Sequence, residues 1–390
     1  MKATFLHTAD WQLGKPFAGV DDVQKRSLIQ QERLNVLQHL ADAAKANQAE
    51  FILVAGDIFD SPSTTKATVS AACARIGAMG LPVFAIPGNH DWGGPGSIWE
   101  QPFFQHEREQ LAPNLTVLLK PEPVELETVV LFPCPLLRRH ESADTTTWLR
   151  SIEAELSRFS DKARLVLAHG SVHGFGAQVD DEEMEGGGIN QIDLSRLPEG
   201  CFDYVALGDW HGMKQVGPKA WYAGTPEMDR FARGAGNEPG HVLIVTVERN
   251  DIPKVRPVRT ARLGWQQVAF QFAEDTSLAR LEEQIDGLIG TRAQQDLLLL
   301  ELHGSLGIEA TIRLEQKLEA WQARLLRLKL ANWTVIAPSP EETEALIRRT
   351  SDPLIARVAA NLVSATSGDG ESAACARIAL RELHAACREI

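Results

Sequence analysis

Short apolar runs alternate with longer amphipathic stretches from the start of the chain to about residue 262. Seven of these runs are rich in β-branched or aromatic residues and break at Gly, Pro, Asn or Asp, which predicts strands. They are FLHTAD (5–10), FILVAGDIF (51–59), PVFAIPGNH (82–90), VVLFPCPL (129–136), RLVLAHGS (164–171), YVALGDWH (204–211) and HVLIVTVE (241–248). Apolar residues at helical spacing predict helices over residues 28–46 and 65–79. This alternation is typical of a layered α/β fold with buried sheets.

The pattern changes after Pro257. Apolar runs at 265–272, 297–304 and 326–336, with predicted helices over 278–289 and 308–324 between them, indicate a small separate α/β unit. Ser339 and Glu342 then form a capping-box pattern with Pro340 at the first helical position, so the last segment is predicted to be helical. We therefore divide the chain into residues 1–262, 263–337 and 338–390. The acidic and glycine-rich stretch 180–188 predicts an exposed loop.

The composition narrows the class of protein. Of the 390 residues, 44% are apolar and 23% are charged, as in an ordinary globular protein of two or three domains. No apolar run approaches the roughly 18 residues of a membrane helix, and the N-terminus has no signal-peptide pattern, so we expect a cytoplasmic protein. The net charge of −13 argues mildly against nucleic acid unless a local basic groove or metal ions offset it. Five cysteines without C-x-x-C argue against disulfides and a zinc knuckle.

Polar side chains follow five of the predicted strands at their C-terminal ends, where open α/β sheets place their sites. Their carboxylates, imidazoles and amides are ligands for hard or borderline divalent metals. One Gly-Asp pair or one His is ordinarily a turn or a packed core residue, but the same pattern at five strand ends predicts a metal site. In the first strand, the period of two puts Asp10 and Gln12 on one side and His7 on the other. The residues of the predicted site are Asp10, Gln12, Asp57, Asn89, His90, Asp91, His169, Asp209 and His211.

The order D-x-(H), GD, GNH(D/E), H and G-x-H along the chain resembles the calcineurin-like metallophosphoesterases. The segments HTADWQLGKPF, LVAGDIFD and WYAGTPE are more specifically similar to the SbcD-type DNA double-strand-break repair nucleases. The resemblance covers about residues 1–260 and implies an α/β sandwich of four layers, two β-sheets flanked by helices. It further implies that a small α/β capping domain contacts DNA and that C-terminal helices dock an SbcC-like coiled-coil ATPase. Members of this family also commonly form homodimers.

The same resemblance implies two divalent metal ions, with Mn²⁺ or Mg²⁺ favoured over Zn²⁺ by an oxygen-rich donor set. Asp10, Gln12, Asp57 and His211 would hold one ion, and Asp57, Asn89, His169 and Asp209 the other. His90 would act as the cation or general acid near the leaving oxygen, with Asp91 holding its ring. Two positions depart from the family pattern, because Gln12 and Asp209 both stand where a His ligand is usual.

The activity that follows is metal-dependent hydrolysis of DNA phosphodiester bonds, as an exonuclease or endonuclease in DNA repair. Two alternatives stay open. The negative charge favours a phosphodiesterase or phosphatase acting on other substrates, and the changes at Gln12 and Asp209 would also fit a non-catalytic scaffold with a decayed metal site. The chain has no G-x-x-x-x-G-K-[ST], G-x-S-x-G or H-E-x-x-H motif, which argues against an ATPase, a serine hydrolase and a zincin protease.

Overall fold

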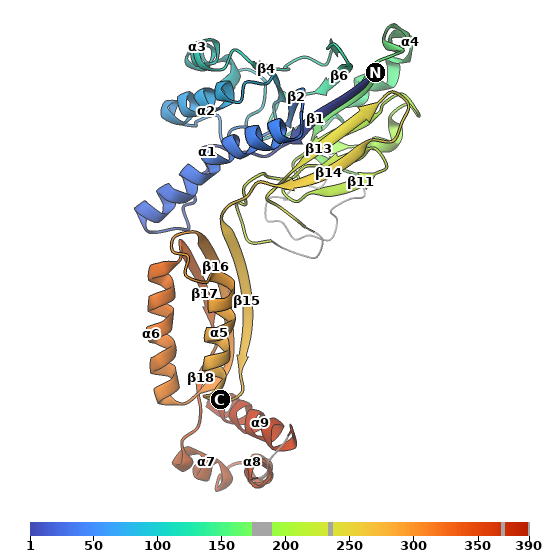
Figure 1. Cartoon of the computed structure of the whole chain (residues 1–390). Helices are drawn as coiled ribbons and strands as arrows, with labels where there is room; N and C mark the ends of the chain where they lie inside the picture. The colour runs from blue at the N-terminus through green and yellow to red at the C-terminus, as the bar shows by residue number, and fades with distance from the viewer. Residues whose placement is uncertain (174–188, 233–236, 368–370, 389–390) are drawn as a thin grey trace. The chain divides into compact units, whose positions relative to one another are not determined.

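The computed structural model describes residues 1–173, 189–232, 237–367 and 371–388. The chain divides into two compact units, Met1–Leu263 and Gly264–Ile390 (Figure 1). The acidic stretch 180–188, predicted to be an exposed loop, lies outside the described residues. Within the described part of the chain, none of the helices has the length and apolar character needed to cross a membrane.

Two six-stranded sheets form the centre of the first unit. One sheet has the order β14 (Lys254–Arg259), β13 (His241–Glu248), β1 (Lys2–Thr8), β2 (Phe51–Ala55), β3 (Val83–Ile86) and β4 (Leu115–Val117). The other has the order β11 (Lys214–Gly217), β12 (Ala220–Tyr222), β10 (Tyr204–Gly208), β7 (Ala163–His169), β6 (Val129–Cys134) and β5 (Val124–Glu125). The strands β1 to β4 run parallel to one another, as do β6, β7, β10 and β12.

The sheets pack face to face, and helices cover both outer faces. In β1, Phe5 points into the layer between the sheets, whereas its neighbour Leu6 packs under the helices. The same alternation in β2 sends Leu53 inward and Ile52 outward, which explains why these strands read as continuous apolar runs. The helices of this unit are α1 (Val23–Ala46), α2 (Lys66–Ala78), α3 (Pro102–Leu111) and α4 (Glu153–Leu156), with the short 3-10 helices η1 (Ile98–Glu100), η2 (Thr147–Ser151), η3 (Ser157–Phe159) and η4 (Leu194–Arg196). The predicted α/β class with two sheets flanked by helices is confirmed.

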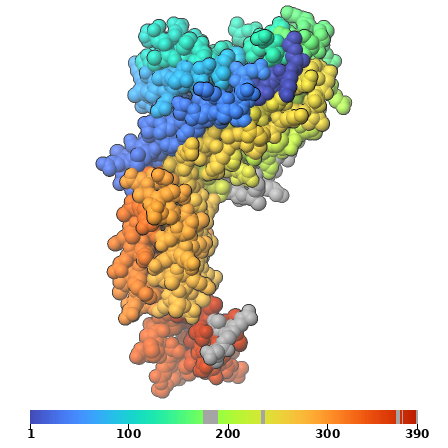
Figure 2. Space-filling view, viewed as in Figure 1, coloured from blue at the N-terminus to red at the C-terminus, as the bar shows by residue number. Residues whose placement is uncertain are grey.

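Segments far apart in the sequence meet in the first sheet. Strand β13 pairs antiparallel with β1, with Lys2 opposite Glu248 and His7 opposite Leu243. In Figure 2 the dark-blue start of the chain accordingly lies beside the yellow segment that contains β13. A separate two-stranded ribbon joins β8 (Ser171–Val172) to β9 (Gln191–Ile192).

A parallel sheet with two helices on one face forms the first part of the second unit. The elements are β15 (Gly264–Phe272), α5 (Ser277–Ile289), β16 (Asp296–Leu306), α6 (Ile308–Arg324), β17 (Arg327–Asn332) and β18 (Val335–Ile336). Because both crossovers advance the strand order in the same direction, right-handed connections put α5 and α6 on the same face. There, Leu281 and Leu314 pack on alternate strand residues such as Leu300.

Three helices, α7 (Pro340–Ile347), α8 (Pro353–Thr366) and α9 (Glu371–Arg388), follow the sheet. The predicted capping box is present, since the Ser339 hydroxyl accepts from the Glu342 amide and the Glu342 carboxylate accepts from the Ser339 amide. Asp352 caps α8, with Pro353 as its first residue. The start of α1 was predicted too late by five residues, because the first turn exposes Val23 and shows no apolar stripe.

Candidate metal centre

The five strand ends that carry the predicted ligands converge on one place. Strands β1, β2 and β3 are parallel neighbours in the first sheet, so their C-terminal ends share one edge. Strands β7 and β10 are parallel neighbours in the second sheet, and both contact β2 across the sandwich. The C-terminal ends of strands from both sheets therefore lie at the same site.

The backbone leaves the strands in left-handed conformations at the site. Asp10, Gln12, Asp57 and Asp209 have φ angles of 53°, 42°, 57° and 101°, which are costly for residues other than glycine and cluster at functional sites. The loops support each other, because the Asp10 amide donates to the Gly56 carbonyl (3.1 Å) and the Gln12 amide to the Asp57 carbonyl (2.9 Å). Asp10 and Gln12 thus lie beyond the end of β1, so the period-two argument does not apply to them.

Arg33 fixes the loop that carries Asp10 and Gln12. Its guanidinium, buried on the inner face of α1, donates to the carbonyl oxygens of Asp10 (3.2 Å), Gln12 (3.3 Å) and Glu227 (3.0 Å). Sequence reasoning missed this residue. The signal was present, since Arg33 occupies a core position between Ile29 and Val36 in an otherwise apolar helix face.

Three oxygen atoms from three other strand ends surround the Nε2 atom of His169. That atom lies 2.9 Å from Asn89 Oδ1, 3.6 Å from Asp57 Oδ2 and 3.8 Å from Asp209 Oδ1. Ligands about 2.1 Å from one ion are separated by distances of this order, so the four atoms fit a single divalent ion. Ligand atoms of Asp10, Asp57 and His169 also lie within 4.8 Å of one another, and all three residues are buried.

Two glycines allow the donors to approach each other. A Cβ atom on Gly56 would lie 2.2 Å from Nδ1 of His169, and one on Gly88 would lie 2.1 Å from Oδ1 of Asp57. The Nδ1 atom of His169 is in turn hydrogen-bonded to the Ala55 carbonyl (2.8 Å), which leaves Nε2 for a ligand. Gly56 of the first Gly-Asp motif and Gly88 of the Gly-Asn-His motif therefore leave the space that the ligand side chains occupy, besides any role in a turn.

The charges of the buried cluster favour a cation. Burial, with the nearby charges of Asp57 and Asp209, raises the pKa of Asp10 to about 6, and burial also raises the pKa of Asp209. For His169 burial acts against the charged ring, but the charges of Asp57, Asp10 and Asp209 outweigh it and raise the pKa to about 9. Without a metal the cluster thus retains protons to balance its carboxylates, and a divalent ion can take their place.

On the side of the site formed by Gln12 and His211, the side chains bond to one another and to Lys15 and Asp229. Gln12 Nε2 lies 3.3 Å from Nε2 of His211, while Gln12 Oε1 accepts a hydrogen bond from the Lys15 ammonium at 2.7 Å. Lys15 also pairs with the buried carboxylate of Asp229 (2.7 Å), which accepts from Nδ1 of His211 (3.1 Å). The sequence offered little to identify Asp229, which follows the WYAGTPE segment without a motif of its own.

His90 lies at the rim of the site, but its ring contacts a different residue from the one predicted. Its Nδ1 atom is hydrogen-bonded to the carbonyl oxygen of Asp60 (2.8 Å), with the Asp60 carboxylate 4.0 Å away. Burial acts to lower the pKa of His90, but the charge of Asp57 and the Asp60 carbonyl raise it overall. Asp91 instead accepts backbone N–H bonds from Gly88 (2.8 Å) and Phe59 (3.0 Å). Asp91 therefore shapes the loop that carries Asn89 and His90, and Asp60 orients the ring.

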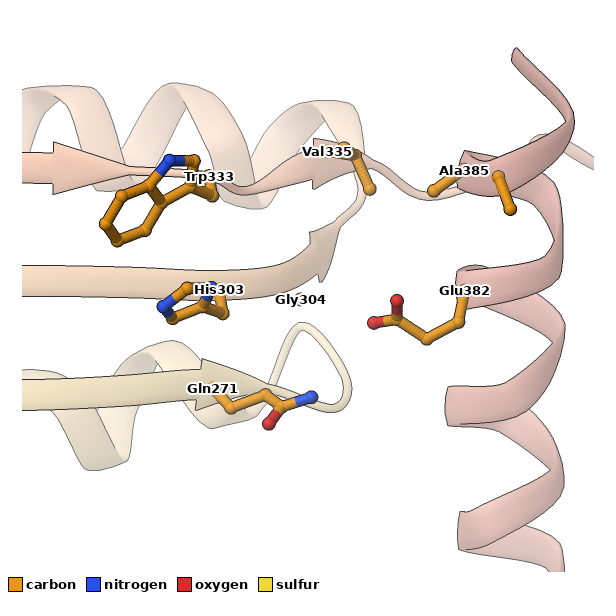
Figure 3. Close-up of a pocket in the computed structure, with 8 residues that line it drawn as sticks. Gln271, His303, Gly304, Trp333, Val335, Glu382 and Ala385 are labelled. Atoms are coloured by element: carbon orange, nitrogen blue, oxygen red, sulfur yellow. The ribbon is translucent and has the colours of Figure 1, made fainter. Parts of the chain in front are cut away.

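The second unit contains a pocket of about 570 Å³ at the end of its sheet (Figure 3). His303 stacks on Trp333, with ring centroids 4.6 Å apart and an interplanar angle of 19°. Figure 3 shows Glu382 of α9 facing the strands beside this pair. An aromatic pair next to a carboxylate suits a flat or cationic group better than a phosphate.

Part of the chain is similar to curated proteins of known name. The chain is 29% identical over 274 residues to the SbcD component of nuclease SbcCD from Bacillus subtilis, covering 62% of this chain and 65% of that protein. It is 24% identical over 224 residues to the protein of the same name from Staphylococcus epidermidis, covering 53% and 56%. The chain thus spans less than two thirds of the length of these relatives.

Solved structures also match, with low overall similarity. The crystal structure of TT1561 of Thermus thermophilus aligns with a TM-score of 0.42 and 12% identity, over 67% of this chain and 100% of that one. A putative 5'-nucleotidase from Staphylococcus aureus aligns with a TM-score of 0.38 and 14% identity, over 66% and 55%. Residues 3–213 match the family described as Calcineurin-like phosphoesterase, which is more than half of the chain. By this match and by the donor cluster at its strand ends, the chain belongs to the calcineurin-like phosphoesterase family.

Proposed function

We propose that the chain is a metal-dependent nuclease that hydrolyses phosphodiester bonds of DNA and works in DNA repair with an SbcC-like ATPase. The observation that carries the proposal is the set of donor atoms within 3.8 Å of His169 Nε2, with His90 at the rim. The two relatives that are components of nuclease SbcCD support DNA as the substrate and an SbcC-like protein as the partner.

In this proposal Asp57, Asn89, His169 and Asp209 hold one ion, and Asp10, Asp57 and His211 are the ligands offered to a second. Divalent ions, Mn²⁺ by our proposal, would supply Lewis-acid activation and neutralise charge on the phosphodiester. Asp60 fixes His90 through Nδ1, so Nε2 is left to donate a proton to the leaving oxygen. The raised pKa of His90 favours the protonated ring that this role requires.

The second unit contributes exposed groups of the kind that contact DNA. Lys329 of β17 is exposed, and Trp333, which follows the same strand, is 56% exposed. An ammonium binds a phosphate backbone, and an indole stacks on unpaired bases. We propose that residues 263–337 act as the capping domain on this basis.

The helices of residues 338–390 are proposed to dock the ATPase partner. Helix α8 exposes Leu354 (65%) and Val358 (40%) one turn apart, as an amphipathic helix does when another protein covers one face. Binding of a separate ATPase protein to the full chain, and its loss in a Leu354→Glu, Val358→Glu double variant, would test this role.

Cleavage of end-labelled linear DNA in Mn²⁺, in Mg²⁺ and in EDTA tests the nuclease directly. We expect cutting in metal only, and its loss in His90→Ala. His106→Ala is the matched control, because His106 is an exposed residue of α3 that belongs to none of the proposed ligand positions, and the change should leave the rate unchanged. Absence of cutting in every metal, with and without the partner, would exclude the nuclease.

A phosphodiesterase acting on other substrates is the second candidate. The net charge of −13 favours it, because an acidic surface repels a long phosphate backbone. Rapid hydrolysis of bis(p-nitrophenyl) phosphate by a protein that leaves DNA intact would favour this candidate. The opposite result, in which DNA is cut at metal concentrations where the small diester is not hydrolysed, would exclude this second candidate.

A further inference from the structure

The side-chain amide of Gln12 is held between a cation and an imidazole. Gln12 is fully buried, and its Oε1 atom lies 2.7 Å from the ammonium of Lys15. Its Nε2 atom lies 3.3 Å from Nε2 of His211. Lys15 is itself anchored, because it also pairs with Asp229 at 2.7 Å and its side chain is only 19% exposed.

These contacts decide which end of the amide faces the metal site. An ammonium has three donors and no acceptor, so the Gln12 atom 2.7 Å away must be the oxygen. The opposite orientation would place amide N–H groups against the Lys15 ammonium. The nitrogen of Gln12 therefore points to His211, where it can donate a hydrogen bond but cannot bind a metal ion.

The tautomer of His211 agrees with this orientation. Its Nδ1 atom lies 3.1 Å from the carboxylate of Asp229, which can only accept, so Nδ1 carries the proton. Its Nε2 atom then has a free lone pair, which accepts the Gln12 amide proton. The same lone pair is the one that His211 would offer to an ion, so Gln12 competes with the metal for it.

We propose that Lys15 keeps Gln12 out of the metal coordination, so that the chain binds one divalent ion tightly and a second one weakly. The tight position is the one around His169, where Asp57, Asn89 and Asp209 supply the other donors. The weak position keeps Asp10, Asp57 and His211, and has lost the donor at position 12. The inference rests on the proposed metal centre, and it names the residue that determines how many ions the centre binds tightly.

Mn²⁺ binding to the full chain tests the proposal, with bound metal counted after equilibrium dialysis and paired ions detected by electron paramagnetic resonance. We expect one tight ion in the wild type and a second at least about tenfold weaker, the usual scale for residues that orient ligands. In Lys15→Met the amide is free to turn its oxygen inward and a nearby positive charge is gone. The second ion should then bind at least about tenfold more tightly and give the resonance of a coupled pair.

Further variants separate the parts of the argument. The double variant Lys15→Met, Gln12→Leu should lose the gain, because no amide oxygen is left to bind, and tightening that persists there would overturn the role of Gln12. Lys45→Met, at an exposed lysine of α1, should bind as the wild type does. Two equally tight ions in the wild type would overturn the inference even if Lys15→Met failed to fold. Absence of any bound ion in the wild type would instead overturn the metal centre itself.

Discussion

Replacing Gly56 by alanine perturbs the metal centre through one atom. The added Cβ would lie 2.2 Å from Nδ1 of His169, about 1 Å closer than carbon and nitrogen atoms approach without a bond. The ring cannot retreat easily, because Nδ1 is hydrogen-bonded to the Ala55 carbonyl and Gly208 packs against it. His169 must therefore leave the position in which its Nε2 atom meets the other donors.

The loss of unfolding free energy in Gly56→Ala has two parts, which a control variant can separate. Gly56 has a φ of 96°, and a side chain in a left-handed conformation costs roughly 1–2 kcal/mol of unfolding free energy. Gly80 has a φ of 68° with nothing within 4 Å of an added Cβ, so Gly80→Ala carries the conformational cost alone. The overpacking against His169 adds about 1–3 kcal/mol in Gly56→Ala, and displacement of a metal ligand weakens Mn²⁺ binding by about 10- to 100-fold.

The assay is urea unfolding in EDTA together with calorimetric titration of Mn²⁺, for the wild type and both variants. We expect Gly80→Ala to lose stability but to bind Mn²⁺ as the wild type does, and Gly56→Ala to lose both. If the two variants bind Mn²⁺ equally well, the contact between Gly56 and His169 does not hold the ligand in place, and the reasoning is refuted.

Three further predictions concern buried charged or titratable groups. Burial lowers the pKa of His7 to about 3, so between pH 6.5 and pH 3 only the unfolded state takes up a proton at this residue. The unfolding free energy should therefore be about 1.4 kcal/mol lower at pH 5.5 than at pH values well above 6.5. In EDTA, His7→Gln should not show this loss. Arg33→Met removes the hydrogen bonds of a buried guanidinium to three carbonyl oxygens and should lower the unfolding free energy by about 3 kcal/mol or more in urea titrations, whereas a change under about 1 kcal/mol would contradict the bonding described. Because the pKa of His169 is raised to about 9 against the effect of burial, Mn²⁺ binding near pH 7 should release about one proton and tighten as the pH rises; a calorimetric enthalpy independent of the buffer would disprove this.

Most inner strands could be predicted from the sequence because they are buried on both faces, and most helices because their apolar residues recur at helical spacing. The edge strands β4, β5, β11 and β14 were not predicted, because they are short or partly exposed and show no continuous apolar run. The convergence of the site was also within reach, since parallel strands bring their C-terminal ends together. The geometry of the backbone and side chains at those strand ends could not be predicted. Whether the side chains of Asp10 and Gln12 meet depends on left-handed φ angles, which follow from hydrogen bonds to residues 56–57 and not from strand periodicity.

Contacts between distant residues set the remaining details of the site. Asp91 follows His90 directly, but the ring nitrogen of His90 meets Asp60, 30 residues earlier in the chain. Lys15 belongs to no ligand motif in the sequence, and its partner Asp229 lies 214 positions away along the chain. Pairings of this kind depend on the tertiary fold, and a single sequence carries no signal for them.

The pairing of β1 with β13 has a consequence for synthesis of the chain. Strand β1 ends at Thr8 and its antiparallel neighbour ends at Glu248, so β1 keeps an open edge until about 240 more residues have been made. At roughly 5–20 residues per second, ribosomes need about 10 to 50 seconds for this stretch. An apolar strand with unpaired amides is prone to pair with other chains during that time. Production of this protein should therefore depend on chaperones, or on slow expression at low temperature, more than its final stability would indicate.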